Sequence, residues 1–183
     1  MCRYAFSTYK SHFACFHCRK TFKQPPFTDL LQRIGKRKHY DSLMRKPQKH
    51  LTEKELQLIS ELDKNYKARE IKCPECGELM ADLGLDFKSP KKTAIKEWKI
   101  IEGLYTIGIN FYSCGCIGIG YVPKSPKAYE QYLKNRLMHY ENSIAFYQTK
   151  TKKEYNDKVQ RIKYWTEQAN LVKAELTKQK FAF

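Results

Sequence analysis

The chain has 183 residues and a formal charge of +16, from 35 Lys and Arg against 19 Asp and Glu. An excess of this size makes a dense array of negative charge, above all nucleic acid, the first expected partner. No uncharged apolar run is long enough to span a bilayer, so we expect no membrane association. The N-terminal residues lack the apolar core of a signal peptide, which predicts a reducing, cytoplasmic location.

The charge is distributed unevenly along the chain. Residues 1–50 carry 12 basic and 2 acidic residues, residues 51–126 carry 11 of each, and residues 127–183 carry 12 and 6. The cationic excess therefore lies in the two outer parts. Together with the elements below, this predicts a first domain over residues 1–124 with a basic helical insertion at about 25–70, and a helical arm over residues 125–183.

The first elements surround a pair of cysteines. Tyr4–Phe22 is rich in aromatic residues and predicts a strand, a tight turn and a second strand, with Cys15 and Cys18 in the turn. Phe27–Met44 predicts one helix, which Pro47 stops.

The middle of the chain begins with a capping box, Thr52-Glu53-Lys54-Glu55. It predicts a helix whose apolar side contains Leu56, Ile59, Leu62 and Tyr66. A turn follows at 73–77, and then a short helix around Ala94 to Glu102 that Gly103 ends. Residues 104–122 predict two strands joined at Cys114-Gly115-Cys116.

The C-terminal arm is predicted to be helical. Ser125 is a typical cap with Pro126 at the first helical position, and no glycine or proline follows. Apolar residues repeat at coiled-coil spacing, but the phase breaks between Thr151 and Tyr155. The arm is either one long helix with a stutter or two helices that fold back around residues 148–153, and the weak helix formers there favour the hairpin.

The cysteines occur in metal-ligand pairs. Cys15-Phe16-His17-Cys18 and Cys73-Pro74-Glu75-Cys76-Gly77 are both C-x-x-C turns, a spacing that points two thiolates at one metal ion. The second turn resembles the C-P-x-C-G knuckle of zinc-ribbon proteins, over about a quarter of the chain. The resemblance implies a Zn²⁺ site and a small β-structure, without implying an activity. With the helices, it predicts an α+β fold: a small zinc-ribbon-like β-core with a helical insertion and a C-terminal long helix or helical hairpin.

Three assignments of the cysteines remain open from the sequence. Cys15, Cys18, Cys73 and Cys76 form the site, or Cys114 and Cys116 join the second pair in place of the first, or the thiols bind no metal. The first is favoured because both of its pairs have the C-x-x-C spacing.

The candidate nucleic-acid contacts are the cations near the first knuckle and in the basic insertion. They are Arg19, Lys20, Lys23, Arg33, Lys36, Arg37, Lys38, Arg45, Lys46 and Lys49. Aromatic residues interleave with the first of these, as in proteins that stack RNA bases and contact phosphates.

No phosphate loop, nucleophile elbow or zinc-protease motif occurs, so we do not expect an enzyme. The preferred function is a zinc-binding, RNA-binding protein associated with ribosomes, in a structural or regulatory role. The alternatives are a DNA-binding transcription or repair factor and a zinc-stabilised adaptor for proteins. RNA is favoured over DNA because no helix-turn-helix or basic-zipper signature is present, and the C-terminal helices are expected to bind a second copy or another protein.

Overall fold

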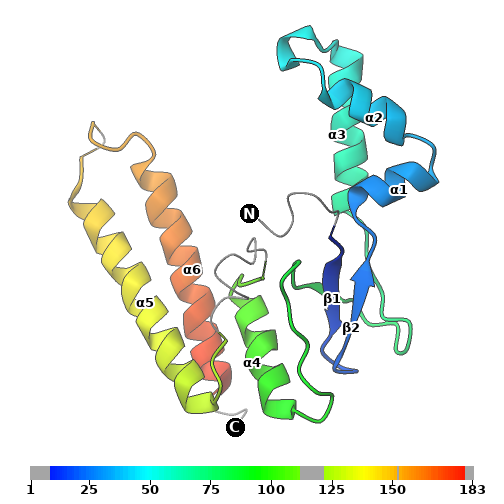
Figure 1. Ribbon diagram of the computed structural model, residues 1–183. Coiled ribbons are helices and arrows are strands. Elements are labelled where there is room, and N and C mark those ends of the chain that lie inside the picture. Colours follow the sequence, from blue (N-terminus) through cyan, green and yellow to red (C-terminus); the bar gives the residue numbers. More distant parts are fainter. Residues whose placement is uncertain (1–8, 112–121, 152, 180–183) are drawn as a thin grey trace, which may run out of the picture. The chain divides into compact units, whose positions relative to one another are not determined.

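A computed structural model describes residues 9–111, 122–151 and 153–179. The chain divides into two compact units (Figure 1). Of the described residues, the first unit holds 9–89 and 111, and the second holds 90–110 and 122–179. Within the part of the chain that the structure describes, one three-stranded antiparallel sheet and six α-helices confirm the predicted α+β class. None of the described helices is long and apolar enough to cross a bilayer.

The sheet of the first unit has the strand order β2-β1-β3. The strands β1 (Ser11–Cys15) and β2 (Lys20–Gln24) form the hairpin predicted around the first cysteine pair, with Phe13 opposite Phe22. On its other edge β1 pairs with the short β3 (Ala81–Asp82), which follows the second cysteine pair. The central strand therefore brings two regions that are distant in sequence side by side.

The predicted helix over residues 27–44 is wrong in one respect, because the structure has two helices there. The helix α1 (Phe27–Arg33) ends at Gly35, whose φ of +70° is readily adopted only by a residue without a Cβ atom. The N–H of Lys36 donates to the carbonyl of Leu31 at 2.9 Å, as expected for a glycine-terminated helix. The chain then starts again as α2 (Arg37–Met44).

A 3₁₀ turn, η1 (Gln48–His50), leads to α3 (Glu53–Lys67). The predicted capping box is confirmed: the Glu55 N–H donates to Thr52 Oγ1, and the Thr52 N–H donates to the Glu55 carboxylate at 2.8 Å. Phe27 connects the three helices, since its ring contacts Tyr40 of α2 at 5.1 Å and Tyr66 of α3 at 4.9 Å. Residues 25–70 therefore contain the predicted helical insertion.

In the second unit, α4 (Ile95–Thr106) is longer than predicted. Gly103 does not end this helix; it is buried within it, beside Tyr129 and Glu175. The helix ends instead at Gly108, which has a φ of +80° and is followed by a hydrogen bond from the Ile109 N–H to the Leu104 carbonyl. The predicted strands are therefore wrong at 104–111, where the structure has the end of α4 and an irregular segment, and the part of this prediction that falls on 112–121 lies outside the described residues.

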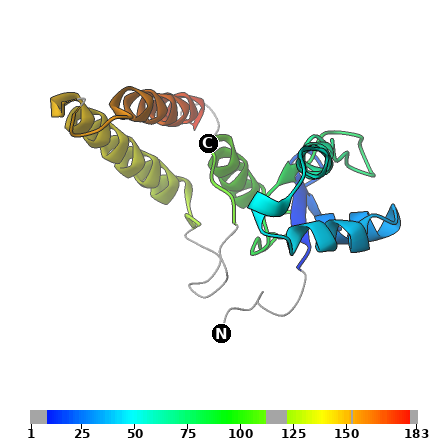
Figure 2. The ribbon, with the colours of Figure 1, turned by 90° about the horizontal axis from the view of Figure 1, so that it is seen from above.

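The C-terminal arm is a helical hairpin, α5 (Pro126–Thr149) and α6 (Lys158–Gln179). The two helices run antiparallel and side by side in both views (Figures 1 and 2). The predicted cap is confirmed, because Ser125 Oγ accepts from the Ala128 N–H at 3.2 Å. An exposed ion pair between Lys173 and Glu141 at 3.0 Å links α6 to α5.

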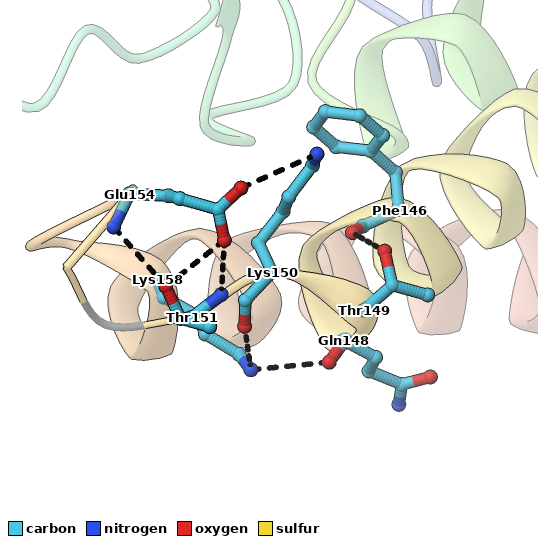
Figure 3. A network of polar contacts seen from close by, with 7 residues as sticks. All are labelled: Phe146, Gln148, Thr149, Lys150, Thr151, Glu154 and Lys158. Atoms are coloured by element: carbon cyan, nitrogen blue, oxygen red, sulfur yellow. Dashed lines mark hydrogen bonds and ion pairs between the residues drawn. The ribbon is translucent and has the colours of Figure 1, made fainter.

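The turn of this hairpin has its own polar network (Figure 3). Thr151 Oγ1 accepts from the Glu154 N–H, and the Glu154 carboxylate accepts from the Thr151 N–H at 2.7 Å, a reciprocal pair of hydrogen bonds within the turn that precedes α6. The Lys158 ammonium donates to the carbonyls of Gln148 at 3.1 Å and Lys150 at 2.5 Å, at the end of α5. A cation at a helix C-terminus is favourable because the last carbonyls have no partner within the helix. The hydrogen bonds of Lys158 therefore stabilise the turn between the two helices.

Candidate metal centre

Four thiols meet in the first unit. The Sγ atoms of Cys15, Cys18, Cys73 and Cys76 all lie within 4.8 Å of one another. Cys15 Sγ is 3.5 Å from Cys76 Sγ, and Cys73 Sγ is 4.0 Å from Cys18 Sγ. Zinc bound by four sulfurs at about 2.3 Å requires sulfur–sulfur distances of roughly 3.8 Å. These residues are therefore able to hold one metal ion.

The first knuckle is built by the β1–β2 hairpin. Cys15 is the last residue of β1, and the chain reverses through Arg19, whose φ of +54° is uncommon for a residue other than glycine. The Cys18 N–H points back and donates to Cys15 Sγ at 3.3 Å. Such backbone donors compensate negative charge on a thiolate.

The second knuckle is closed by a bridge between Lys72 and Leu79. The Cys73 N–H donates to the Glu78 carbonyl at 2.8 Å, and the Gly77 N–H donates to the Cys73 carbonyl at 2.9 Å. Gly77 has a φ of +78°, which explains the glycine of the C-P-x-C-G sequence. An ion pair between Lys20 and Glu75, which sequence reasoning missed, joins the two knuckles.

Packing around the thiols is apolar. Cys15 and Cys73 are buried together with Met80, and Phe13 and Phe22 pack against them. Cys18 and Cys76 are half-buried. The four thiols therefore lie at the edge of a small apolar core. Because so few apolar side chains are buried there, a bound ion would contribute a large part of the stability of this region.

The thiols differ in acidity. Burial opposes ionisation of Cys73, but hydrogen bonds from the backbone N–H groups of Glu75 and Cys76 outweigh it and lower the pKa of Cys73 to about 7. The hydrogen bond with Cys76, followed by desolvation, raises the pKa of Cys18 to about 12. Desolvation also raises the pKa of Cys15. One thiol is thus prepared to bind as a thiolate, while Cys15 and Cys18 must release protons.

The alternative ligands Cys114 and Cys116 lie outside the described residues. Their contribution to the centre therefore stays a prediction. A cluster of four sulfurs is complete without them, because structural zinc takes four ligands.

Of the ten candidate nucleic-acid contacts, three are engaged in ion pairs. Lys20 pairs with Glu75, Arg37 with Asp41 at 2.6 Å, and Lys46 with Glu55 at 2.7 Å. Three others have further contacts within the first unit: the Lys23 ammonium lies 5.3 Å from the centroid of the Tyr9 ring, and the side chains of Arg33 and Lys36 line a pocket between α1 and α3. The remaining positions are Arg19 in the first knuckle, Lys38 in α2, and Arg45 and Lys49, which are exposed near η1.

The pocket between α1 and α3 was not predicted. It has a volume of about 390 Å³, and its apolar lining includes Leu31 and Leu62. Arg33, Lys36 and Arg69 contribute positive charge to it. The helical periodicity of α3 predicted that Leu62 lies on its apolar side. The pocket itself forms only where α1 and α3 meet, so it could not be predicted from either helix alone.

Comparisons of the chain with protein-family models, with curated proteins and with solved structures each found no match. The chain is an α+β protein with four clustered cysteines that are able to hold a metal ion.

Proposed function

We propose that this chain is a zinc-stabilised RNA-binding protein whose basic insertion contacts phosphates. The observation that carries the proposal is the charge of residues 27–50, which have seven Lys and Arg against two Asp. Lys36, Lys38 and Arg45 are exposed and have no ion pair with any described carboxylate. Exposed, uncompensated cations at this density favour a polyanion.

Zinc is the proposed metal because of the ligand chemistry. Four thiolates in a closed tetrahedral set are typical of structural zinc, although the same set also binds iron. Elemental analysis of protein expressed without added metal distinguishes the two ions. The proposed role of the ion is to hold both knuckles together at the base of the helical insertion, so that the cations of α1 and α2 are presented on a defined surface.

Structured or single-stranded RNA, including ribosomal RNA, is the proposed partner, and a ribosome-associated role belongs to the same proposal. The main alternative is duplex DNA in a transcription or repair factor. Direct competition between the two nucleic acids at equal phosphate concentration decides between them. If duplex DNA binds more tightly, the RNA-binding function is refuted in favour of DNA binding.

The test is a salt titration of RNA affinity with a triple variant, Lys36→Gln, Lys38→Gln and Arg45→Gln. If these side chains contact phosphates, the log–log slope against salt flattens by about two to three units. The matched control replaces Lys54, Lys64 and Lys67 of α3 by Gln, which removes the same charge from a helix with four acidic and three basic residues. The control should leave the slope nearly unchanged; equal slopes for both variants would refute a specific basic surface.

A second candidate function, an adaptor for an acidic protein segment, is favoured by the pocket between α1 and α3. Its apolar lining encloses about 390 Å³ and carries three basic residues against one acidic residue, Glu61, which fits an apolar side chain flanked by carboxylates. Under this alternative no RNA binding is measurable at about 0.15 M salt. The salt titration therefore separates the two functions as well.

A further inference from the structure

The second unit contains an open pocket between α5 and α6, with a volume of about 430 Å³. Aromatic side chains form most of its lining. The ring centroid of Trp165 lies 4.9 Å from that of Tyr164, at 70°, and 5.9 Å from that of His139, at 84°. Tyr164 is 52% exposed, so a ring face remains accessible. The pocket is large enough for a flat heterocycle.

One cation of this pocket has no counter-charge in the described chain. Arg136 is half-buried, and its guanidinium donates to the hydroxyls of Tyr132 at 2.8 Å and Tyr140 at 2.7 Å. Both acceptors are neutral, and no described carboxylate pairs with it. A half-buried charge is costly unless an opposite charge compensates it. The tyrosine hydroxyls fix the guanidinium in place without neutralising it.

The same hairpin offers a direct comparison. Arg161 also donates to a tyrosine hydroxyl, that of Tyr147, at 2.9 Å. However, Arg161 pairs with the carboxylate of Asp157 at 2.8 Å, which neutralises it. Two Arg–Tyr clusters thus lie on α5 and α6, and only that of Arg136 combines a pocket with an uncompensated charge among the described residues.

We propose that this pocket binds one unpaired nucleotide of single-stranded RNA, with the base against Tyr164 and Trp165 and its phosphate on Arg136. A nucleotide supplies both features that the pocket lacks, a flat ring to stack and an anion for the guanidinium. Charge complementarity extends beyond the pocket, because residues 126–179 carry eleven Lys and Arg against six Asp and Glu. The inference rests on the proposed RNA-binding function and adds a second, base-dependent contact to it.

The experiment uses the full-length, metal-loaded protein and two fluorescent probes of equal length: a single-stranded oligoadenylate and the corresponding abasic oligonucleotide. Tyr164→Ala should weaken binding of the oligoadenylate about 5- to 150-fold and leave binding of the abasic probe unchanged. Tyr164→Phe should retain affinity because it keeps the ring. Phe146→Ala removes another exposed ring of the same hairpin and should change neither affinity.

The arginines form a second matched pair. Arg136→Gln should weaken both probes and flatten the salt slope by about one unit, whereas Arg161→Gln should leave the slope unchanged. Circular dichroism checks that each variant is folded. If Arg136→Gln unfolds the hairpin, Tyr164→Ala still decides the proposal, since its side chain is at the surface.

Three outcomes would overturn the inference: an equal loss for both probes in Tyr164→Ala, no loss for either, or displacement of the oligoadenylate by a phosphotyrosine peptide at lower concentration than by AMP. The triple variant of the basic insertion keeps this result separate from the proposed function. If that variant binds oligoadenylate normally while Tyr164→Ala does not, phosphate binding by the basic insertion is refuted and nucleotide binding by the pocket is supported. If Tyr164→Ala binds oligoadenylate normally while the triple variant does not, nucleotide binding by the pocket is refuted and phosphate binding by the insertion is supported.

Discussion

The Sγ atoms of Cys15 and Cys76 lie 3.5 Å apart, although 61 positions separate the two residues in the chain. The helices α1, α2 and α3 occupy half of the sequence between them. A metal ion bound here would close a long loop at its base, so its loss should destabilise both knuckles and the insertion together.

The first prediction concerns the identity of the ligands. Purified protein should contain about one zinc ion per chain. Cys15→Ser or Cys76→Ser should lose this ion and lower the stability of the β-structure, because the ion holds two knuckles together whose shared core is small. Elemental analysis and circular dichroism measure the two effects.

Cys114→Ser and Cys116→Ser are the controls for that experiment, and both should keep the metal. Loss of zinc in these two variants, with zinc retained in Cys15→Ser, would transfer the site to the alternative ligands. Absence of metal from all preparations made without chelator would refute the site altogether.

The second prediction concerns protons. The pKa of Cys73 is lowered to about 7, so this thiol is mostly ionised above that pH and mostly protonated below it. The number of protons released per zinc ion bound should therefore rise by about one as the pH falls from about 8 to about 6. Because protons compete with the metal, affinity falls as the pH falls, and more steeply below about 7.

Calorimetric titration with zinc in buffers of different ionisation enthalpy measures this proton count. Circular dichroism of the metal-free protein must show retained strand structure, since an unfolded chain would show ordinary thiol pKa values. A proton count that stays constant across this pH range would contradict the lowered pKa of Cys73.

The third prediction concerns Gly103 in α4. Replacing a glycine in a helix interior by alanine ordinarily stabilises a protein by about 1 kcal/mol. Here the new Cβ atom would lie 2.1 Å from Glu175 Oε1 and 2.3 Å from the Tyr129 hydroxyl oxygen, both on buried side chains. We therefore expect Gly103→Ala to lower the free energy of unfolding by about 1–3 kcal/mol, measured by urea denaturation.

Lys96→Ala, at an exposed position of the same helix, controls for helix propensity and should change stability little. Tyr129→Phe isolates the polar contact, because the Tyr129 hydroxyl donates to Glu175 Oε1 at 3.2 Å. That variant should cost about 1–3 kcal/mol. An increase in stability on Gly103→Ala would show that Tyr129 and Glu175 can move aside freely.

The fourth prediction concerns the extent of the second unit. A fragment of residues 90–183 should resist urea better than a fragment of residues 125–183. The longer fragment contains α4, whose Trp98, Ile101 and Leu104 are buried. Equal midpoints for the two fragments would mean that the hairpin is stable without α4. Comparing helicity at several protein concentrations also tests whether the hairpin pairs between chains.

Much of the local structure was determined by the sequence alone. The cap at Ser125, the capping box at Thr52 and the two knuckle turns involve partners a few residues apart, so short patterns specify them. The bend of the C-terminal arm was also predictable, because weak helix formers coincide there with a break in apolar phase.

Tertiary structure decided the features that depend on distant partners. Gly103 was predicted to end a helix, since glycine is a poor helix residue. It lies inside α4 instead, where the absence of a Cβ atom leaves room for the side chains of Tyr129 and Glu175. The contacts of Arg136 with Tyr132 and Tyr140, and of Arg161 with Asp157, each span four residues of sequence, but the pocket that Arg136 lines exists only because α5 and α6 pack together. Hydrogen bonding within one helical turn can be read from spacing, but a contact between helices depends on which faces pack together, and only the folded chain determines that.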